Sequence, residues 1–242
     1  MRVAWQDHLH FEAQRAHYAW DQGNRSGPGR LHLRHVDLQQ LSLEGGYLHR
    51  SLWHGCNAQD AHLAGSGLEE AELRECNLRG ANLALADMDR IRLTHVDLSD
   101  ATLDLAHLDA AELEHVDLTG ARMTRVTLDG ARLHDVTLVG ARLVDVRLDH
   151  AVLRRCNLAG ADLSRTHPLP RFKERCTAAH ARFESCDLRG ADLRGLTLLD
   201  TELVDCQLAG VRGVPRLAGP CRVHARDVDG AWLLSTWQHA QE

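Results

Sequence analysis

Leucine recurs at every fifth position along most of this chain. Between Leu33 and Leu163 there are 27 positions that end in 3 or 8, and 23 of them are leucine; the exceptions are Trp53, Ala58, Met88 and Met123. Two positions before these sites the sequence places small or β-branched residues. An α-helix repeats its apolar side every 3.6 residues and a strand alternates every second residue. A period of five fits neither, so it predicts a higher-order repeat.

The repeating unit resembles the motif A(D/N)LXX of the pentapeptide-repeat family. The clearest units are Ala81-Asn82-Leu83, Ala161-Asp162-Leu163 and Ala191-Asp192-Leu193. The resemblance extends over residues 31–210. It implies an all-β fold, a right-handed quadrilateral β-helix (a pentapeptide-repeat solenoid) of about nine coils, in which four pentapeptides form each coil. It also implies that the leucine and the small residue point inward and the other three positions face solvent.

A coil of four pentapeptides should stack residues that lie 20 apart in the chain. One predicted inward column carries mostly valine or cysteine: Val36, Cys56, Cys76, Val96, Val116, Val136, Cys156, Cys176 and Leu196. Another carries alanine: Ala61, Ala81, Ala101, Ala121, Ala141, Ala161 and Ala181. A simple five-residue period would not separate the two sets, so the sequence itself supports four sides.

Three segments depart from the repeat. Residues 1–30 concentrate aromatic residues and are expected to cap the first coil, because the open ends of a solenoid need covering. Residues 211–242 are expected to form a C-terminal cap. Residues 166–175 place prolines and a lysine where the repeat would need leucine, and neither residue type fits a hydrogen-bonded, dry coil. This last segment is therefore predicted to leave the coil as a loop.

The predicted loop is basic around one aromatic residue, on an otherwise acidic protein. Its candidate partner-binding residues are His167, Pro168, Arg171, Phe172, Lys173 and Arg175. A contact with a partner protein and a tolerated insertion without function are both open readings, because surface loops accept insertions.

The C-terminal segment has the pattern of a short helix that begins after Asp229. Trp232, Leu233 and Trp237 on this helix are expected either to cover the last coil or to pair with another subunit, since exposed apolar patches mark interfaces. The family resemblance favours a homodimer through the C-terminal end.

Composition narrows the function classes. The net charge is −6, with 26% charged and 4% aromatic residues; this mild acidity argues against non-specific nucleic-acid binding. The sequence contains no apolar run long enough for a transmembrane helix. The N-terminus lacks the pattern of a secretory signal. We therefore expect a cytoplasmic protein with no direct contact to nucleic acid or membrane.

Six of the seven cysteines occupy the small inward position of the repeat. The pairs Cys56/Cys76, Cys156/Cys176 and Cys186/Cys206 are expected to be stacked neighbours, near disulfide range. Cytosolic thiols stay reduced, so cysteine is expected here as a small apolar core residue.

Motifs of enzymes and cofactor sites are missing from the sequence. It has no phosphate-binding loop, dinucleotide fingerprint, nucleophile elbow or zinc-type cysteine pairing. One outward column, Glu75, His95, His115 and Asp135, has ligand-type side chains. Side chains on one flat face rarely enclose an ion, so a solvated ladder is expected rather than a metal site. We expect no catalytic residue, metal or cofactor.

Two functions are consistent with the sequence. One is a protein that binds DNA gyrase or topoisomerase IV by mimicking DNA and so gives resistance to gyrase-targeting antibiotics; the family resemblance implies it, because some members, including the Qnr group, bind gyrase. The other is a general protein-interaction adaptor or effector component with an unknown partner. A locally basic middle of the rod, at Arg122, Arg132, Arg142 and Arg147, counts against continuous mimicry of phosphate charge.

Overall fold

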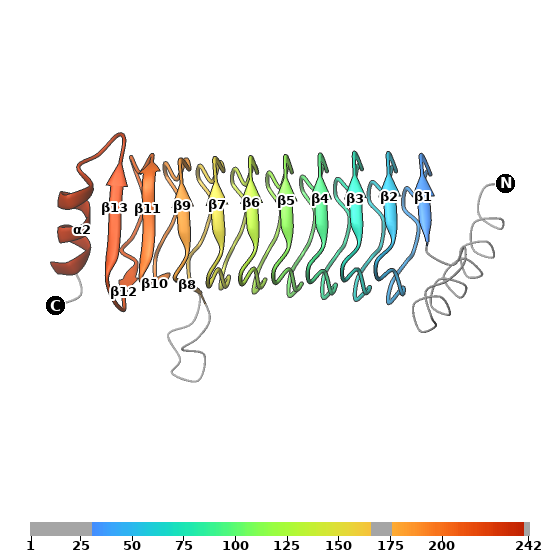
Figure 1. Cartoon of the computed structure of the whole chain (residues 1–242), viewed down its shortest axis with the longest axis horizontal. Coiled ribbons are helices and arrows are strands. Elements are labelled where there is room, and N and C mark those ends of the chain that lie inside the picture. The colour runs from blue at the N-terminus through green and yellow to red at the C-terminus, as the bar shows by residue number, and fades with distance from the viewer. Residues whose placement is uncertain (1–30, 166–175, 240–242) are drawn as a thin grey trace.

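The computed structural model describes residues 31–165 and 176–239. Figure 1 shows them as one straight rod of stacked coils, with β1 at one end and the helix α2 at the other. The interior is a single apolar cluster that runs the length of the rod.

One side of the rod is a ten-stranded parallel sheet in the order β1-β2-β3-β4-β5-β6-β7-β9-β11-β13. Its strands are β1 (His32–Arg34), β2 (Leu52–His54), β3 (Glu72–Arg74), β4 (Arg92–Thr94), β5 (Glu112–Glu114), β6 (Arg132–His134), β7 (Val152–Arg154), β9 (Arg182–Glu184), β11 (Thr201–Cys206) and β13 (Cys221–Ala225). A second sheet holds β8 (Thr177–Ala179), β10 (Thr197–Leu199) and β12 (Arg216–Leu217).

The four sides of a coil follow one another along the chain. We number them from the ten-stranded sheet, so side 1 begins at residue 31, side 2 at 36, side 3 at 41 and side 4 at 46. Single parallel bridges join successive coils on the other sides, for example Asp37↔Asn57, Ser42↔His62 and Tyr47↔Gly67. Each of these three bridges joins residues 20 apart. The predicted four-sided β-solenoid is therefore confirmed.

The leucine positions form the core. Leu63 is 0% exposed and Leu118 is 1% exposed. Trp53 replaces a leucine and is buried too; its indole Nε1 donates a hydrogen bond to Ser51 Oγ at 2.9 Å. A fully buried leucine contributes about 1.5–3 kcal/mol, and each coil repeats this contribution on all four sides.

The fifth residue of each pentapeptide forms the corner between two sides, and the backbone conformation at the corner determines which residue types occur there. Nearly every residue whose number ends in 5 or 0 has a positive φ, for example Gly65 (64°), Asp100 (59°) and Leu105 (64°). This left-handed conformation costs an L-residue about 1–2 kcal/mol, and glycine adopts it freely. No β-branched residue has a positive φ within the described residues.

The columns of inward residues predicted to stack at intervals of 20 are wrong beyond residue 165. The ten residues 166–175 amount to half a coil, so the spacing between stacked residues becomes 30 across them: Arg147 pairs with Thr177 and Asn157 with Asp187. Cys176 therefore belongs to side 4 and Ala181 to side 1. Leu196, two residues before Leu198 of β10, also belongs to side 4, because β10 pairs with β8. The side 2 column continues from Cys156 to Cys186 and Cys206.

The cysteines are free thiols. Cys56, Cys76, Cys156, Cys176, Cys186 and Cys206 are buried. Burial raises the pKa of the Cys176 thiol to about 12, so this thiol is protonated at neutral pH. The predicted stacks Cys56/Cys76 and Cys186/Cys206 are present, whereas Cys156 stacks on Cys186 rather than on Cys176.

The parallel ladder continues past residue 210 through β12 and β13. The helix α2 (Gly230–His239) then closes the end of the rod. Asp229 Oδ1 accepts hydrogen bonds from the N–H groups of Ala231 (2.9 Å) and Trp232 (3.0 Å), as an N-cap residue does. Within the described part of the chain, no helix has the length and apolar character to cross a bilayer.

Candidate functional site

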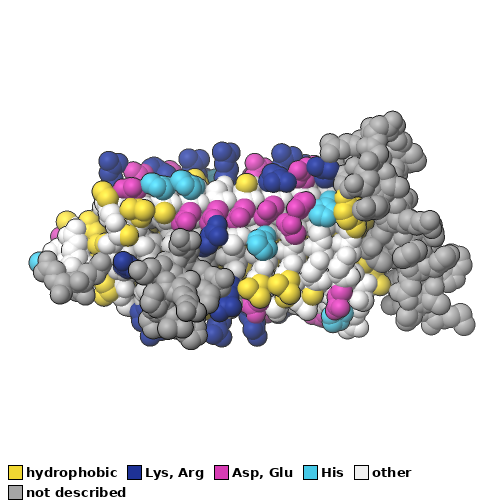
Figure 2. Space-filling model, turned by 90° about the horizontal axis from the view of Figure 1, so that it is seen from below, with side chains coloured by type: hydrophobic (Ala, Val, Ile, Leu, Met, Phe, Trp, Pro, Cys, Tyr) yellow, Lys and Arg dark blue, Asp and Glu magenta, His cyan; other side chains and the backbone are white. Residues whose placement is uncertain are grey.

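Side 4 carries an unbroken row of acidic residues, which we call the acidic ladder: Glu69, Asp89, Asp109, Asp129 and Asp149. Each stands one coil above the one before it, in the fourth position of its pentapeptide. Figure 2 shows this row as a straight line of acidic side chains along the rod. At the strand spacing of about 4.8 Å, its four steps extend over about 19 Å.

The fold holds most of the ladder carboxylates in place. The backbone N–H of Asp109 donates to Asp89 Oδ1 at 3.0 Å, and that of Asp129 donates to Asp109 Oδ1 at 2.9 Å. The N–H groups of Asp149 (3.2 Å) and Ala179 (2.8 Å) continue the pattern. Each aspartate thus satisfies an amide of the next coil with one oxygen, and its second oxygen is left for other contacts.

The charge of the ladder is only partly balanced. His49 Nδ1 lies 3.1 Å from Glu69 Oε2, and Arg147 forms an ion pair with Asp129. Among the described residues no cation forms an ion pair with Asp89, Asp109 or Asp149. Burial and neighbouring carboxylates raise the pKa of Asp89. The row is therefore a concentrated negative charge that a positively charged surface would stabilise.

An exposed pair of leucines lies beside the ladder. Leu85 and Leu105, at the corner between sides 3 and 4, are 61% and 41% exposed. They belong to successive coils, because the N–H of Leu85 donates to Asp104 O and that of Leu105 to Thr124 O. We call them the leucine ridge. Figure 2 shows apolar side chains in a second line, parallel to the acidic one.

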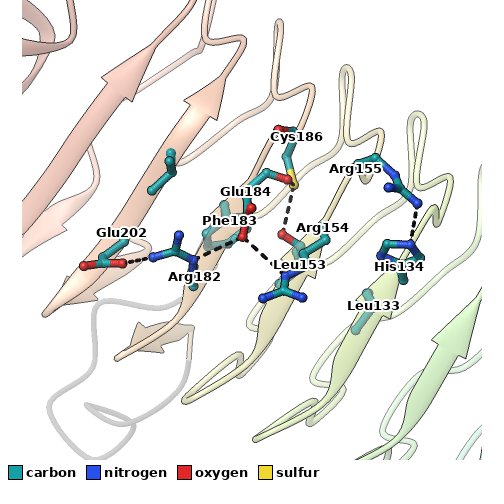
Figure 3. A network of polar contacts seen from close by, with 12 residues as sticks. Leu133, His134, Leu153, Arg154, Arg155, Arg182, Phe183, Glu184, Cys186 and Glu202 are labelled. Atoms are coloured by element: carbon teal, nitrogen blue, oxygen red, sulfur yellow. Dashed lines mark hydrogen bonds and ion pairs between the residues drawn. The ribbon is translucent and has the colours of Figure 1, made fainter.

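Side 1 has a different electrostatic character. Arginine and glutamate alternate from β3 to β6. Arg92 lies 3.3 Å from Glu112 and 3.9 Å from Glu72. Figure 3 shows the same arrangement further along, where Arg182 is held between Glu202 and Glu184. A shallow depression of about 620 Å³ over β3–β7 is lined in part by charged side chains of this sheet, among them Arg92, Glu112 and Arg132. Side 1 is therefore largely self-neutralised.

The His column on side 1 forms a stacked ladder. The His95 and His115 rings are parallel, with centroids 4.7 Å apart. Beyond them, the Arg155 guanidinium lowers the pKa of Asp135 to about 2. Over residues 31–165 and 176–239, no group of three or more His, Cys, Asp or Glu side chains is placed to hold a metal ion.

The arginines predicted to make the middle of the rod basic are in part neutralised. Arg122 lies 2.8 Å from Asp104, and Arg147 pairs with Asp129. Arg132 and Arg142 have no ion pair within the described part of the chain. These arginines stand on sides 1 and 3 and at the edge of side 4, so they do not interrupt the acidic ladder.

The residues predicted as contact sites differ in where they lie in the structure. His167, Pro168, Arg171, Phe172, Lys173 and Arg175 lie outside the described residues. On α2, Trp237 is buried (2% exposed), Leu233 is half-buried and Trp232 is 63% exposed. Trp237 therefore covers the last coil, and Trp232 points away from it.

The acidic ladder and the leucine ridge were missed in the sequence, where the carboxylates look scattered. The signal that reveals the ladder is an acid at every twentieth residue from 69 to 149. The ridge leaves a weaker signal, leucine at the two corner positions 85 and 105, where glycine, aspartate or histidine is more usual in this chain.

Comparison with known proteins identifies the family. The family model for pentapeptide repeats matches in eight copies, over residues 54–90, 86–125, 106–143, 131–167 and 175–212. No curated protein sequence matches the chain significantly.

Two solved structures match most of the length of this chain at low sequence identity. HetL, a pentapeptide repeat protein involved in heterocyst differentiation regulation from the cyanobacterium Nostoc sp. strain PCC 7120, is 22% identical with a TM-score of 0.46, over 88% of this chain and 95% of HetL. A trypsin-treated form of QnrB1, a plasmid-mediated fluoroquinolone resistance protein, is 16% identical with a TM-score of 0.45, over 88% of this chain and 96% of that one.

Proposed function

The chain belongs to the pentapeptide-repeat family, and on that premise we propose that it is a non-enzymatic scaffold that binds a partner protein through side 4 of the rod. The observation that carries this proposal is the acidic ladder. Five carboxylates repeat at one fixed spacing on one flat face; in the described chain Asp129 forms an ion pair with an arginine and Glu69 lies beside a histidine. Such a face attracts a partner of opposite charge and sets its register.

The ladder carboxylates repel one another and so destabilise the folded protein, which supports a role for them beyond folding. Like charges on adjacent strands destabilise a sheet, and the raised pKa of Asp89 has the direction that this repulsion and burial produce. Asparagine would accept the same backbone hydrogen bonds without charge. The repeat itself uses asparagine at other positions, for example Asn77 and Asn157. The charge therefore calls for an explanation that hydrogen bonding does not supply.

Salt-dependent capture tests the proposal. Immobilised wild-type protein is expected to retain a partner near 0.05 M salt and to release it near 0.5 M, where the Debye length falls below about 5 Å. A variant with Asp89→Asn, Asp109→Asn and Asp129→Asn keeps the acceptor oxygens and should not retain that partner. If both proteins capture the same partners equally, side 4 is not the binding face.

A second, more specific candidate is DNA gyrase or topoisomerase IV as the partner, with resistance to gyrase-targeting antibiotics as the outcome. A straight row of carboxylates on a rod favours it, because such a row imitates one edge of a duplex. B-DNA carries one charge per about 3.4 Å on each strand, so a ladder with about 4.8 Å between charges is a diluted imitation.

Gyrase supercoiling distinguishes this candidate from an adaptor with another partner. The purified protein should inhibit supercoiling, or protect it from a gyrase poison, at micromolar concentration or below. The three-asparagine variant should do neither. An absence of any effect by the wild-type protein would reject gyrase and leave the general scaffold to be tested by capture.

A further inference from the structure

We propose that the leucine ridge and the acidic ladder together form a docking surface for an amphipathic helix of a partner protein, with an apolar stripe over Leu85 and Leu105 and a basic stripe over Asp89, Asp109 and Asp129. This inference rests on the proposed scaffold function and specifies the partner. Helices that dock in this way present anchors at i, i+4 and i+7 on one face.

The ridge is unfavourable for the free protein in two independent ways. Both leucines expose large parts of their side chains, 61% and 41%. Both also adopt a positive φ, 60° for Leu85 and 64° for Leu105, which an apolar L-residue adopts at a cost. Equivalent corners carry glycine with open space around it, as at Gly45 and Gly65. Leucine is thus not needed there for the fold.

The surroundings of the ridge specify the charge of the partner. On side 4 of the coils that hold the ridge stand Asp89 and Asp109, neither of which has an ion pair within the described part of the chain. Asp87 and His107 lie between the ridge and the ladder. Arg125 follows Leu105 at the next corner and limits the apolar line at that end. An apolar stripe flanked by basic side chains complements this arrangement.

The spacing favours a helix over a strand. The ladder repeats at about 4.8 Å, whereas one face of an α-helix repeats at about 5.4 Å per turn. The mismatch is about 0.6 Å per step, which flexible lysine side chains can take up. An extended strand presents the same side at about 6.6 Å, a mismatch of about 1.8 Å per step. Over the four steps of the ladder the helix drifts by about 2.4 Å and the strand by about 7.2 Å, so the helix keeps the closer register.

A designed peptide tests the surface directly. The probe is a labelled helical peptide of about 18 residues, with a leucine stripe next to a lysine stripe. Two control peptides replace the leucines by serine or scramble the sequence. Fluorescence anisotropy at low salt measures binding to the wild-type protein, to a Leu85→Gly, Leu105→Gly variant and to the three-asparagine ladder variant. Melting curves check that both variants are folded.

The expected results separate the two proposals. The wild-type protein should bind the leucine–lysine peptide at least about tenfold more tightly than either control peptide. Each variant should lose about tenfold or more, with an unchanged fold. Equal binding of the peptides, or wild-type affinity in the glycine variant, would overturn the docking surface. If only the asparagine variant loses affinity, the ridge is rejected while the acidic scaffold stands; if only the glycine variant does, the basic partner is rejected.

Discussion

At the scale of the residue, the positions of each pentapeptide have different structural roles. The third position is buried almost completely, as at Leu118. Where the second position is aspartate or asparagine, its side chain accepts a hydrogen bond from the amide two residues later, as Asp117 does from Thr119 at 2.9 Å. The fifth position turns the corner with a positive φ. The fourth position is partly exposed to solvent, and here the ladder residues stand.

Leu118→Lys should unfold the rod or lower its stability by about 4 kcal/mol or more, because an unpaired charge would enter a dry core. Thr119→Lys, next in the chain at a half-exposed site, is the matched control and should be almost neutral. Thermal melting followed by circular dichroism compares them. A Leu118→Lys variant that melts like the wild type would contradict the inward assignment of this column.

Asp89→Asn should raise the melting temperature at pH 7, by a few degrees at most. The pKa of Asp89 is raised in the folded protein, so its ionised form destabilises the fold above that pKa. This penalty disappears as pH falls below the ordinary value for aspartate, about 3.9. The gain should therefore vanish near pH 3.

Asp135→Asn is the control of opposite sign. The Arg155 guanidinium lowers the pKa of Asp135 to about 2, so its ionised form stabilises the fold above the unfolded value and loses this effect as pH falls toward 2. The variant should melt below the wild type at pH 7. If the Asp89→Asn variant also melts at a lower temperature than the wild type at pH 7, ionised Asp89 does not destabilise the fold and repulsion within the ladder is excluded.

At the scale of the element, the described chain consists of short strands that are stable only when stacked. Each strand of side 1 from β1 to β7 has three residues, and its partners lie 20 residues away in the chain. The five-residue period was sufficient to predict this stacking. It could not predict the register beyond Arg165, because an insertion of ten residues preserves the period of five and changes the side that each pentapeptide forms.

Deletion of residues 166–175 should leave the rod folded. Ten residues equal two pentapeptides, and the side 4 segment that begins with Cys176 pairs with side 4 of the preceding coil, as Arg147↔Thr177 shows. The β-type circular dichroism signal and melting temperature should match the wild type, while partner binding weakens if the candidate loop residues contribute. Loss of the β signal would show that the segment is needed for folding.

Asp229→Ala should lower stability by about 0.5–2 kcal/mol, because α2 would lose the acceptor for the amides of Ala231 and Trp232. Asp229→Asn should restore the cap and serves as the control. Hydrogen exchange of the α2 amides, together with thermal melting, measures the effect. Unchanged protection in the alanine variant would mean that packing of Trp237 alone holds the helix.

At the scale of the whole molecule, the stacking of coils aligns residues that lie 20 apart in the chain into rows along the rod. The sequence contains its acids at ordinary intervals, and only the coil of 20 places five of them in one row. The fold class could be predicted because every coil repeats the same signal. The ladder and the ridge were harder to find, since each residue alone looks like a solvated surface position and the pattern appears only across coils.

The measurement that tests the central claim most directly is the affinity of the captured partner for two variants of equal charge. Asp89→Asn, Asp109→Asn, Asp129→Asn removes three charges from side 4, and Asp97→Asn, Asp117→Asn, Asp187→Asn removes three from side 2; each changes the net charge from −6 to −3. The account predicts at least about a tenfold loss, or about 1.4 kcal/mol, for the first variant and near wild-type affinity for the second. Equal losses would show that net charge, rather than the acidic ladder, attracts the partner.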